Sequence, residues 1–239
     1  MTDWTEGYVA DIGYTHGYYA ELGTKRVELA LLNAGLFPPK IQTACELGFG
    51  QGLSTNIHAA ASDVAWYGTD FNPSQAAHAQ TLAANGKSGA QLYNEAFHEF
   101  ANRHDLPAFD FIVLHGIWSW VSDENRAAIV RFINKNLKPG GVVYISYNTL
   151  PGWSAFAPLR QLMTEHVATF GPPGSETLEK IDASIDFVQR FMDLDSKYKR
   201  ANPAVSDKIA QLRDKPKEYL AHEYFNRDWR PMYFSDIHE

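Results

Sequence analysis

The segment TACELGFGQGLS, residues 43–54, constrains the fold of this chain more than any other stretch of its sequence. A short apolar run contains one acid, Glu46, and is followed by three glycines at alternate positions, Gly48, Gly50 and Gly52. Glycine adopts positive φ without steric cost, and it has no Cβ to keep a ligand away from the main chain. Amides at the start of a following helix would point at the same ligand. The segment therefore predicts a strand, a turn that a ligand can approach closely, and a helix.

Short apolar runs alternate with helical patterns from residue 41 onward. The runs predict five strands, at Ile41–Glu46, Ala65–Asp70, Gln91–Asn94, Phe109–His115 and Val142–Tyr147. Between them, helices are predicted at Ser54–Ala61, Pro73–Ala84 and Asp123–Leu137, the last two with the N-caps Asn72 and Ser122. This alternation predicts an α/β fold with a Rossmann-like parallel sheet, in which ligands bind beyond the carboxyl ends of the strands.

The two flanks of the chain depart from this alternation. Thr24–Ala34 has a helical pattern, so residues 1–40 are expected to form an N-terminal helical cap or lid. Residues 41–171 are expected to be the ligand-binding domain, and residues 172–239 a helical segment. That segment carries an apolar stripe at helical spacing, made of Leu178, Ile181, Ile185, Val188 and Met192.

Composition excludes several classes of function. The 239 residues are 45% apolar, which is enough for a sizeable core, and the net charge is −7 with no basic block, which argues against nucleic acid as a partner. No run approaches the roughly 20 apolar residues of a membrane span, and the N-terminus lacks a secretory signal, so a cytoplasmic protein is expected. Cys45, the only cysteine, is expected to be a buried small hydrophobe. The nine histidines do not have metal-site spacing, so no metal is expected.

The spacing of the glycines distinguishes between two kinds of nucleotide ligand. A dinucleotide-binding turn would place its third glycine at position 53, which is leucine here. The acid Glu46 beside the turn would repel a pyrophosphate, but it suits a ligand that carries an ammonium and a sulfonium group. The pattern therefore favours S-adenosylmethionine over NAD.

Further candidate residues follow the ends of the other strands. Asp70 ends the second predicted strand, where a carboxylate can accept hydrogen bonds from both ribose hydroxyls. Glu95 and Ala96 follow the third strand and could meet the adenine amino group and ring. His115 follows the fourth strand and would lie beneath the methionine part of the ligand.

The motifs GYYAEL, ACELGFGQG, YGTDFNPSQA, HGIWSWVS and ISYNTLPGW together give the chain a resemblance to a known family. From about Tyr8 to the C-terminus the chain resembles class I S-adenosylmethionine-dependent methyltransferases, within a bacterial subgroup whose methyltransferase domain precedes a regulatory domain. The resemblance implies that the Glu46–Gly52 turn holds the methionine end, Asp70 and Phe71 the ribose, and Glu95 and Ala96 the adenine. It also implies that Tyr18 and Tyr19 close over the cofactor.

The resemblance includes protein-lysine methyltransferases, so it implies an amine such as a protein lysine as one acceptor. Class I folds usually end in an antiparallel hairpin after the fifth strand, and no such hairpin is visible here, because residues 174–239 have helical patterns. The final stretch LAHEYFNRDWRPMYFSDIHE resembles the lead-in to the regulatory part. We therefore expect the chain to be a fragment or a shortened form.

Methyl transfer needs alignment, exclusion of water and, for an amine, a base. His115 is the best candidate base, but a structural histidine whose backbone alone touches the cofactor is favoured over a catalytic one. Trp118, Trp120, Tyr147 and Trp153 are candidates for an aromatic wall around the acceptor, with Asn148 as a polar guide; the alternative is that these aromatic residues fill the core.

Three other functions stay open from the sequence. The acceptor could be a hydroxyl or amine of a small molecule, as in polysaccharide or natural-product tailoring. The domain could bind the cofactor as a regulatory module without catalysis. An NAD-dependent oxidoreductase is disfavoured by the glycine spacing. The sequence leaves the oligomeric state undetermined.

Overall fold

The computed structural model describes residue 13 and residues 16–170 and 177–238. The chain divides into two compact units, which we call the sheet unit, Tyr14–Tyr147, and the helical unit, Asn148–Glu239. The sheet unit contains a five-stranded parallel sheet with the strand order β3-β2-β1-β4-β5. Its strands are β1 (Thr43–Leu47), β2 (Ala65–Asp70), β3 (Gln91–Asn94), β4 (Phe109–Leu114) and β5 (Leu137–Ile145). The predicted Rossmann-like parallel sheet is confirmed.

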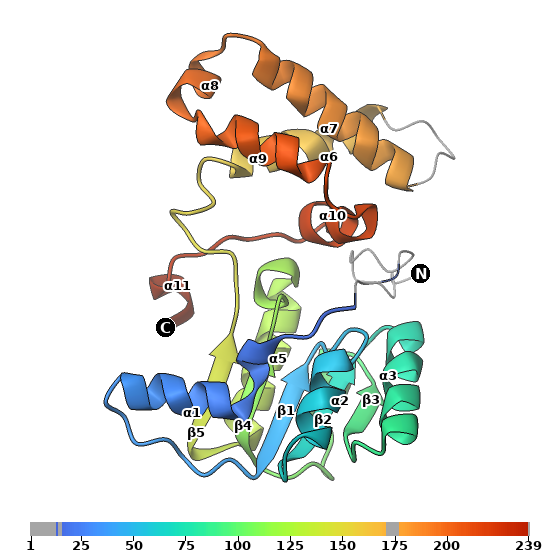
Figure 1. Cartoon of the computed structure of the whole chain (residues 1–239), viewed down its shortest axis with the longest axis vertical. Helices are drawn as coiled ribbons and strands as arrows, with labels where there is room; N and C mark the ends of the chain where they lie inside the picture. Colours follow the sequence, from blue (N-terminus) through green and yellow to red (C-terminus); the bar gives the residue numbers. More distant parts are fainter. Residues whose placement is uncertain (1–12, 14–15, 171–176, 239) are drawn as a thin grey trace. The chain divides into compact units, whose positions relative to one another are not determined.

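Helices connect the strands of the sheet unit. The α-helices are α1 (Thr24–Asn33), α2 (Leu53–Ala60), α3 (Pro73–Gly86), α4 (Phe97–Ala101) and α5 (Asp123–Asn136), and two 3₁₀ turns are η1 (Ala20–Leu22) and η2 (Trp118–Trp120). Figure 1 shows α2 and α3 beside β2 and β3, and α5 beside β4 and β5. Each parallel strand pair is joined by a crossover, so the carboxyl ends of the strands gather at one edge of the sheet.

The predicted helix starts are confirmed by their cap geometry. The Asn72 side chain accepts hydrogen bonds from the amides of Ser74 and Gln75, and Pro73 occupies the first helical position. The Ser122 hydroxyl accepts from the amide of Asn125 at the start of α5. The end of α3 differs from the expected stop at Asn85-Gly86, because the helix continues through Gly86 and Lys87 adopts the left-handed cap conformation.

The fifth strand begins earlier than expected. β5 starts at Leu137 and includes residues 138–141, which were expected to end the preceding helix as a loop. Leu137 pairs with Phe109, whereas the regular pairing resumes at Val142 with Phe111, so residues 138–141 form an insertion in the ladder. Proline and glycines indicate the end of a helix. Here the residues of this pattern lie within β5, where they form an irregularity of the sheet.

Aromatic residues fill both sides of the sheet. On the side covered by α2, Trp66 stacks on His58 and packs edge-on to Phe111. Trp66 and Phe111 are part of a buried cluster with Leu22 and Val113. On the side covered by α4 and α5, Phe132 stacks on Phe100 and packs against Phe109, which meets Tyr67. Burial of large aromatic side chains on both faces explains why the strands read as short apolar runs.

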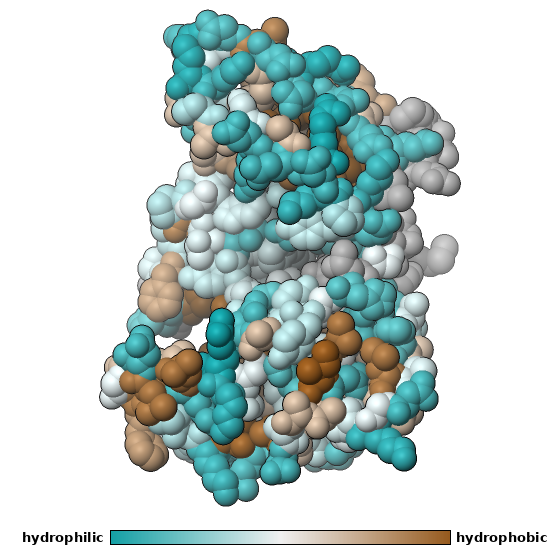
Figure 2. All heavy atoms as spheres, viewed as in Figure 1, coloured by the Kyte–Doolittle hydropathy of each residue, from teal (hydrophilic) through white to brown (hydrophobic). Residues whose placement is uncertain are grey.

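Helix α1 has one face without a covering layer among the described residues. Leu29, Leu32, Leu36 and Phe37 are largely exposed, and Figure 2 shows hydrophobic residues gathered over this part of the chain. The predicted end of α1 is confirmed, since Gly35 has φ 74° just beyond the helix.

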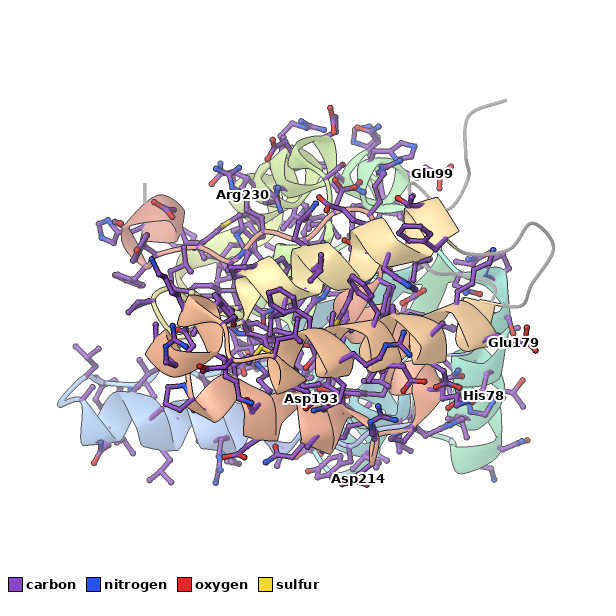
Figure 3. All side chains as sticks on the ribbon, turned by 90° about the horizontal axis from the view of Figure 1, so that it is seen from above. His78, Glu99, Glu179, Asp193, Asp214 and Arg230 are labelled. Atoms are coloured by element: carbon purple, nitrogen blue, oxygen red, sulfur yellow. The ribbon has the colours of Figure 1, made fainter. Side chains whose placement is uncertain are left out.

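The helical unit has its own core. It contains α6 (Ala157–Phe170), α7 (Thr177–Asp193), α8 (Lys197–Ala201), α9 (Ala204–Leu212), α10 (Lys217–Tyr224) and α11 (Ser235–His238). Helix α7 lies along α6, and Glu179 and Asp193 mark the two ends of α7 in Figure 3. The stripe predicted on α7 is buried in this core at Ile181, Ile185, Val188 and Met192; the side chain of Leu178 lies outside the described residues.

The structure moves the boundary that was expected at residue 171. Phe156, Leu159 and Met163, in and before α6, are buried in the same cluster as residues of α7, α9 and α10, so α6 belongs with the helical unit. Two backbone hydrogen bonds join the start of this unit to its end, from the Leu150 amide to the Met232 carbonyl and from the Met232 amide to the Asn148 carbonyl. The first unit therefore ends at Tyr147. Most of the expected 1–40 cap lies outside the described residues or in the sheet unit.

Candidate functional site

The glycine turn lies between β1 and α2, as the sequence predicts. Gly48, Gly50 and Gly52 have φ values of 79°, 56° and 70°, which are strained for any residue with a Cβ. The Gly48 amide donates to the Thr69 carbonyl at 2.8 Å, which ties the turn to the end of β2. Three left-handed residues in so short a stretch fold the main chain back on itself at the carboxyl edge of the sheet.

The first glycine of the turn is also needed for close packing. A Cβ on Gly48 would collide with the side chain of Ile117, whose Cγ1 would lie 2.8 Å away, and Phe97 lies just beyond it. Ile117 and Phe97 follow β4 and β3, so residues from three strand ends converge on the turn. The sequence analysis did not identify Ile117, and an isolated isoleucine in a loop offers no signal that would have done so.

Asp70 lies directly against the turn. Its Oδ2 accepts from the Gly50 amide at 2.8 Å and its Oδ1 accepts from the Asn72 amide at 2.9 Å. Burial raises the pKa of Asp70 to about 6, against the opposing effect of these two amides. Each carboxylate oxygen has a second lone pair, so both can accept one further hydrogen bond, as two adjacent hydroxyls would supply.

Glu46 is the second buried acid beside the turn. It lies on β1 with 3% of its surface exposed, and its Oε2 accepts a hydrogen bond from the Thr55 hydroxyl on α2. Burial raises the pKa of Glu46 to about 7, the Thr55 hydrogen bond lowers it, and the nearby charge of Asp70 raises it further. Two buried carboxyl groups close enough to affect each other create a site that favours a cation.

Glu95 follows β3, but its surroundings differ from the expectation. Its Oε1 pairs with Arg103 at 2.6 Å, and Arg103 also pairs with Asp105 and lies over the Tyr93 ring at 4.2 Å. The Glu95 Oε2 atom is buried and has no hydrogen-bond partner among the described residues. The Oε2 atom therefore has both of its lone pairs available to a ligand. Sequence reasoning missed Arg103, because nothing in its local pattern indicates a partner eight residues before it.

Ala96 and Phe71 occupy the positions next to these acids. The Ala96 amide donates to the Glu99 side chain at 2.9 Å, which starts the short helix α4. The Phe71 carbonyl accepts from the Asn94 side chain at 3.1 Å, so the chain after β2 is held to the end of β3. Both residues are partly buried.

His115 follows β4 and is surrounded by groups from two other segments. Its Nδ1 lies 3.4 Å from the Ser146 Oγ and its Nε2 lies 3.9 Å from Glu21 Oε1. The Tyr19 ring packs on the imidazole with 4.2 Å between centroids. Burial lowers the pKa of His115, and the nearby Glu21 opposes this effect. A neutral imidazole in this position is able to accept a proton.

The tyrosines expected to act as a lid are fixed to α2. The Tyr19 amide donates to the Ser54 hydroxyl at 2.8 Å, and the Tyr19 carbonyl lies 3.0 Å from His58 Nε2. The Tyr18 ring packs against His58 and is half exposed. The structure therefore brings Tyr19 between α2 and His115, whereas Tyr18 lies on the outer part of α2. Ser54, which accepts from the Tyr19 amide and donates to the Gly17 carbonyl, was not identified as a site residue from the sequence.

The predicted aromatic wall comes from both units. Trp118 and Trp120 lie in η2 and Tyr147 at the end of the sheet unit. Trp118 is buried, its carbonyl accepts from Arg126, and its indole Nε1 has no partner among the described residues. Asn148 and Trp153 belong to the helical unit. Their grouping in one wall stays a prediction.

Two searches of the described residues complete the description. They contain no group of three or more His, Cys, Asp or Glu side chains placed to hold a metal ion. None of their helices combines the length and apolar character needed to cross a membrane. Cys45 is buried, as expected, and burial holds the pKa of its thiol well above the ordinary value.

Comparisons with known proteins identify the two parts of the chain. Residues 45–143 match the family model described as a methyltransferase domain, and residues 216–239 match the one described as a predicted methyltransferase regulatory domain. The sheet unit thus carries a methyltransferase domain, and the resemblance drawn from the motifs is confirmed.

Two relatives match most of this chain. The Synechocystis protein sll1526 is 41% identical over 239 residues, which cover 98% of this chain and 46% of that protein. The Rickettsia prowazekii protein RP028 is 28% identical over 211 residues, covering 86% of this chain and 82% of that protein. The chain thus spans about half the length of the first of these relatives.

A solved structure has the same fold. The structure of PKMT2 from Rickettsia typhi in complex with AdoHcy superposes with a TM-score of 0.76 at 23% identity, covering 94% of this chain and 43% of that one. This likeness confirms the fold of the chain.

Proposed function

We propose that this chain, in which residues 45–143 match a methyltransferase domain, binds S-adenosylmethionine at the glycine turn and transfers its methyl group to an amine, with a protein lysine as the leading acceptor. The observation that carries the proposal is the hydrogen bond from the Gly50 amide to Asp70, because it sets a buried carboxylate against the main chain of the glycine turn. The AdoHcy bound to the similar Rickettsia typhi structure supports this choice of cofactor.

The residues of the site fit this cofactor. The absence of a Cβ at Gly50 suits close approach of the methionine part to the main chain, and the free lone pairs of Asp70 suit the ribose hydroxyls. The unpartnered Glu95 Oε2 suits the amino group of adenine. Glu46 and Asp70 together supply negative charge for a ligand that bears an ammonium and a sulfonium group.

The chain's own residues would then prepare the acceptor. When bound, the cofactor supplies a methyl group on a positively charged sulfur, so no protein nucleophile is needed. His115 would accept a proton from the incoming ammonium at one ring nitrogen, because burial lowers its pKa and so favours the neutral imidazole. Ser146 and Glu21 hold the imidazole in place, and the Tyr19 ring covers it from water. Tyr147 and Asn148 are proposed to orient the acceptor.

Incubation with methyl-labelled cofactor and a fractionated bacterial lysate tests the acceptor class. We expect label in protein fractions, recovered as methyl-lysine after hydrolysis, and much less label when Asp70 is replaced with alanine. Label that enters only small molecules would instead support the tailoring enzyme. Tight cofactor binding without any transfer would support a regulatory binding module and overturn the enzymatic proposal.

The two buried acids predict a pH dependence of cofactor binding. Burial raises the pKa of Glu46 to about 7 and that of Asp70 to about 6, so both lose their protons only near neutral pH in the free protein. A cationic ligand binds the deprotonated form, so its affinity should increase from about pH 6 to about pH 8, by at most about tenfold per unit for each group. Isothermal titration in buffers of different ionisation enthalpy should detect proton release.

The Glu46→Gln variant is the control for this prediction. Glutamine keeps an oxygen that can accept from the Thr55 hydroxyl, but it does not titrate. The rise in affinity near pH 7 should become shallower in this variant. An equally steep rise in both proteins would show that Glu46 does not face the ligand's charge.

A further inference from the structure

Lys208 of the helical unit lies over two aromatic rings. Its Nζ is 3.7 Å from the centroid of the Trp153 ring and 4.4 Å from that of Phe156. A cation within about 6 Å of a ring centroid is attracted by the negative charge of the ring face. The ammonium group is therefore held in an aromatic pocket rather than fully in water, and the residue is only partly exposed.

The rings of this pocket are fixed by further aromatic contacts. Trp153 meets Phe156 and Trp229 nearly at right angles, with centroids 5.9 and 5.5 Å apart, and Phe156 meets Tyr224 at 5.6 Å. Phe156 and Tyr224 are almost fully buried. The rings come from the segment before α6, from α10 and from the stretch after α10, so the pocket depends on the fold of the whole helical unit.

A buried arginine supports the outer part of the pocket. Arg160 lies over the Trp229 ring at 5.0 Å and donates to the carbonyls of Tyr224 and Asn226. These hydrogen bonds fix the chain that carries Tyr224 and Trp229. The aromatic faces are thus positioned by the framework, independently of the lysine between them, and would persist if that lysine moved out.

A carboxyl group on α10 lies close enough to the ammonium to act on its charge. Glu223 on α10 interacts electrostatically with Lys208, and burial raises the pKa of Glu223 to about 7 while the lysine charge lowers it. Burial lowers the pKa of Lys208, and Glu223 opposes this shift. Aromatic faces together with one acid are the composition with which proteins bind alkylammonium groups.

We propose that the pocket formed by Trp153, Phe156 and Glu223 binds the alkylammonium side chain of a lysine on the protein acceptor, and that Lys208 occupies it as an internal substitute when no acceptor is present. The proposal rests on the proposed function for the identity of the natural ligand, because a lysine acceptor carries this group. Methylation spreads the positive charge and reduces its hydration, which strengthens its attraction to aromatic faces. The pocket should therefore hold a methylated lysine more tightly than an unmodified one.

Occupation by Lys208 has a measurable consequence. A ligand must displace the internal lysine, so its apparent affinity is reduced by the fraction of molecules in which the pocket is open. Replacing Lys208 with alanine empties the pocket and leaves Trp153, Phe156 and Glu223 in place. Since alanine is a good helix former, α9 should persist in this variant.

The test is a titration of the full chain with trimethyl-lysine whose α-amino group is acetylated and whose carboxyl group is amidated. Binding is measured by tryptophan fluorescence and by calorimetry. The Lys208→Ala variant should bind at least about tenfold more tightly than the unaltered chain. The uncharged analogue with carbon in place of the nitrogen should not bind measurably. Equal affinity of the two proteins, or equal binding of both compounds, would overturn the proposal.

Three controls separate this site from other effects. The Lys215→Ala variant lacks the same charge at an exposed position. It should bind the trimethyl-lysine compound with the same affinity as the unaltered chain. Glu223→Gln in the Lys208→Ala background keeps the rings and should weaken binding several-fold, and Trp153→Leu in that background should abolish it. Binding of S-adenosylhomocysteine, measured in the same variants, reports separately on the proposed function.

Discussion

Replacing Asp70 with alanine is expected to weaken cofactor binding by about 10- to 100-fold, or about 1–3 kcal/mol. The carboxylate is buried, and its two oxygens accept from the amides of Gly50 and Asn72. The substitution removes the acceptors for the ribose hydroxyls and leaves these two amides without their partner. Isothermal titration with S-adenosylhomocysteine measures the loss, and thermal unfolding measures the accompanying change in stability.

Asp110 provides a matched control for this effect. Its Oδ2 accepts from the amides of Gln42 and Thr43 at 2.9 Å each and its Oδ1 pairs with Lys138, but it lies near the start of β4 and therefore at the opposite edge of the sheet. Asp110→Asn should lower the unfolding temperature and leave cofactor affinity unchanged. Asp70→Asn keeps the shape of the side chain and should still weaken binding. Unchanged affinity in both Asp70 variants would place the ribose elsewhere.

The strands and helix starts could be predicted from the sequence because their causes are local. β2 and β3 have the predicted bounds, since turn residues flank a β-branched or aromatic run at each end. Asn72 and Ser122 cap their helices through backbone amides only two or three residues away. The φ values of the glycine turn follow from the spacing of the glycines themselves.

The partners of the candidate site residues could not be predicted, because they depend on the folded arrangement. Glu95 was expected near the adenine amino group, and the sequence did not show that Arg103, just after α4, pairs with one of its oxygens. Ile117 approaches Gly48 only because β4 lies next to β1 in the sheet. Glu95 and Arg103 are brought together by the short helix α4 between them, and Ile117 and Gly48 by strand order; a single sequence records neither contact residue by residue.

The unit boundary was misplaced for a similar reason. The pattern of α6 indicates an amphipathic helix, and an amphipathic helix can cover a sheet or another helix equally well. Only the burial of Leu159 and Met163 beside residues of α7 and α9 assigns it to the helical unit. Trp153, expected near the acceptor, belongs to the same unit, where it contacts Lys208.

Replacing Gly52 with alanine is expected to destabilise the sheet unit by about 2–5 kcal/mol. Gly52 has φ 70°, a conformation that costs a residue with a Cβ about 1–2 kcal/mol. The added Cβ would also collide with the Cβ of Ala79 on α3 and approach its Cα to 3.2 Å, and overpacking of this kind costs about 1–3 kcal/mol. Urea denaturation measures the free energy of unfolding of the variant.

A second variant and a double mutant separate the two contributions. Gly89 has φ 76° and no atom near its would-be Cβ, so Gly89→Ala measures the conformational cost alone. Gly52→Ala combined with Ala79→Gly removes the colliding methyl group, and the pair should be more stable than the sum of the single effects by about 1 kcal/mol or more. The Asn56 side chain donates to the carbonyls of both Gly52 and Ala79. These two hydrogen bonds fix the start of α2 against α3, and they thereby position the turn that the cofactor would contact. If the free energies of unfolding of the two single variants simply add in the double mutant, Gly52 is required for its backbone conformation only. The close approach of α2 to α3 would then not be the reason for a glycine at this position.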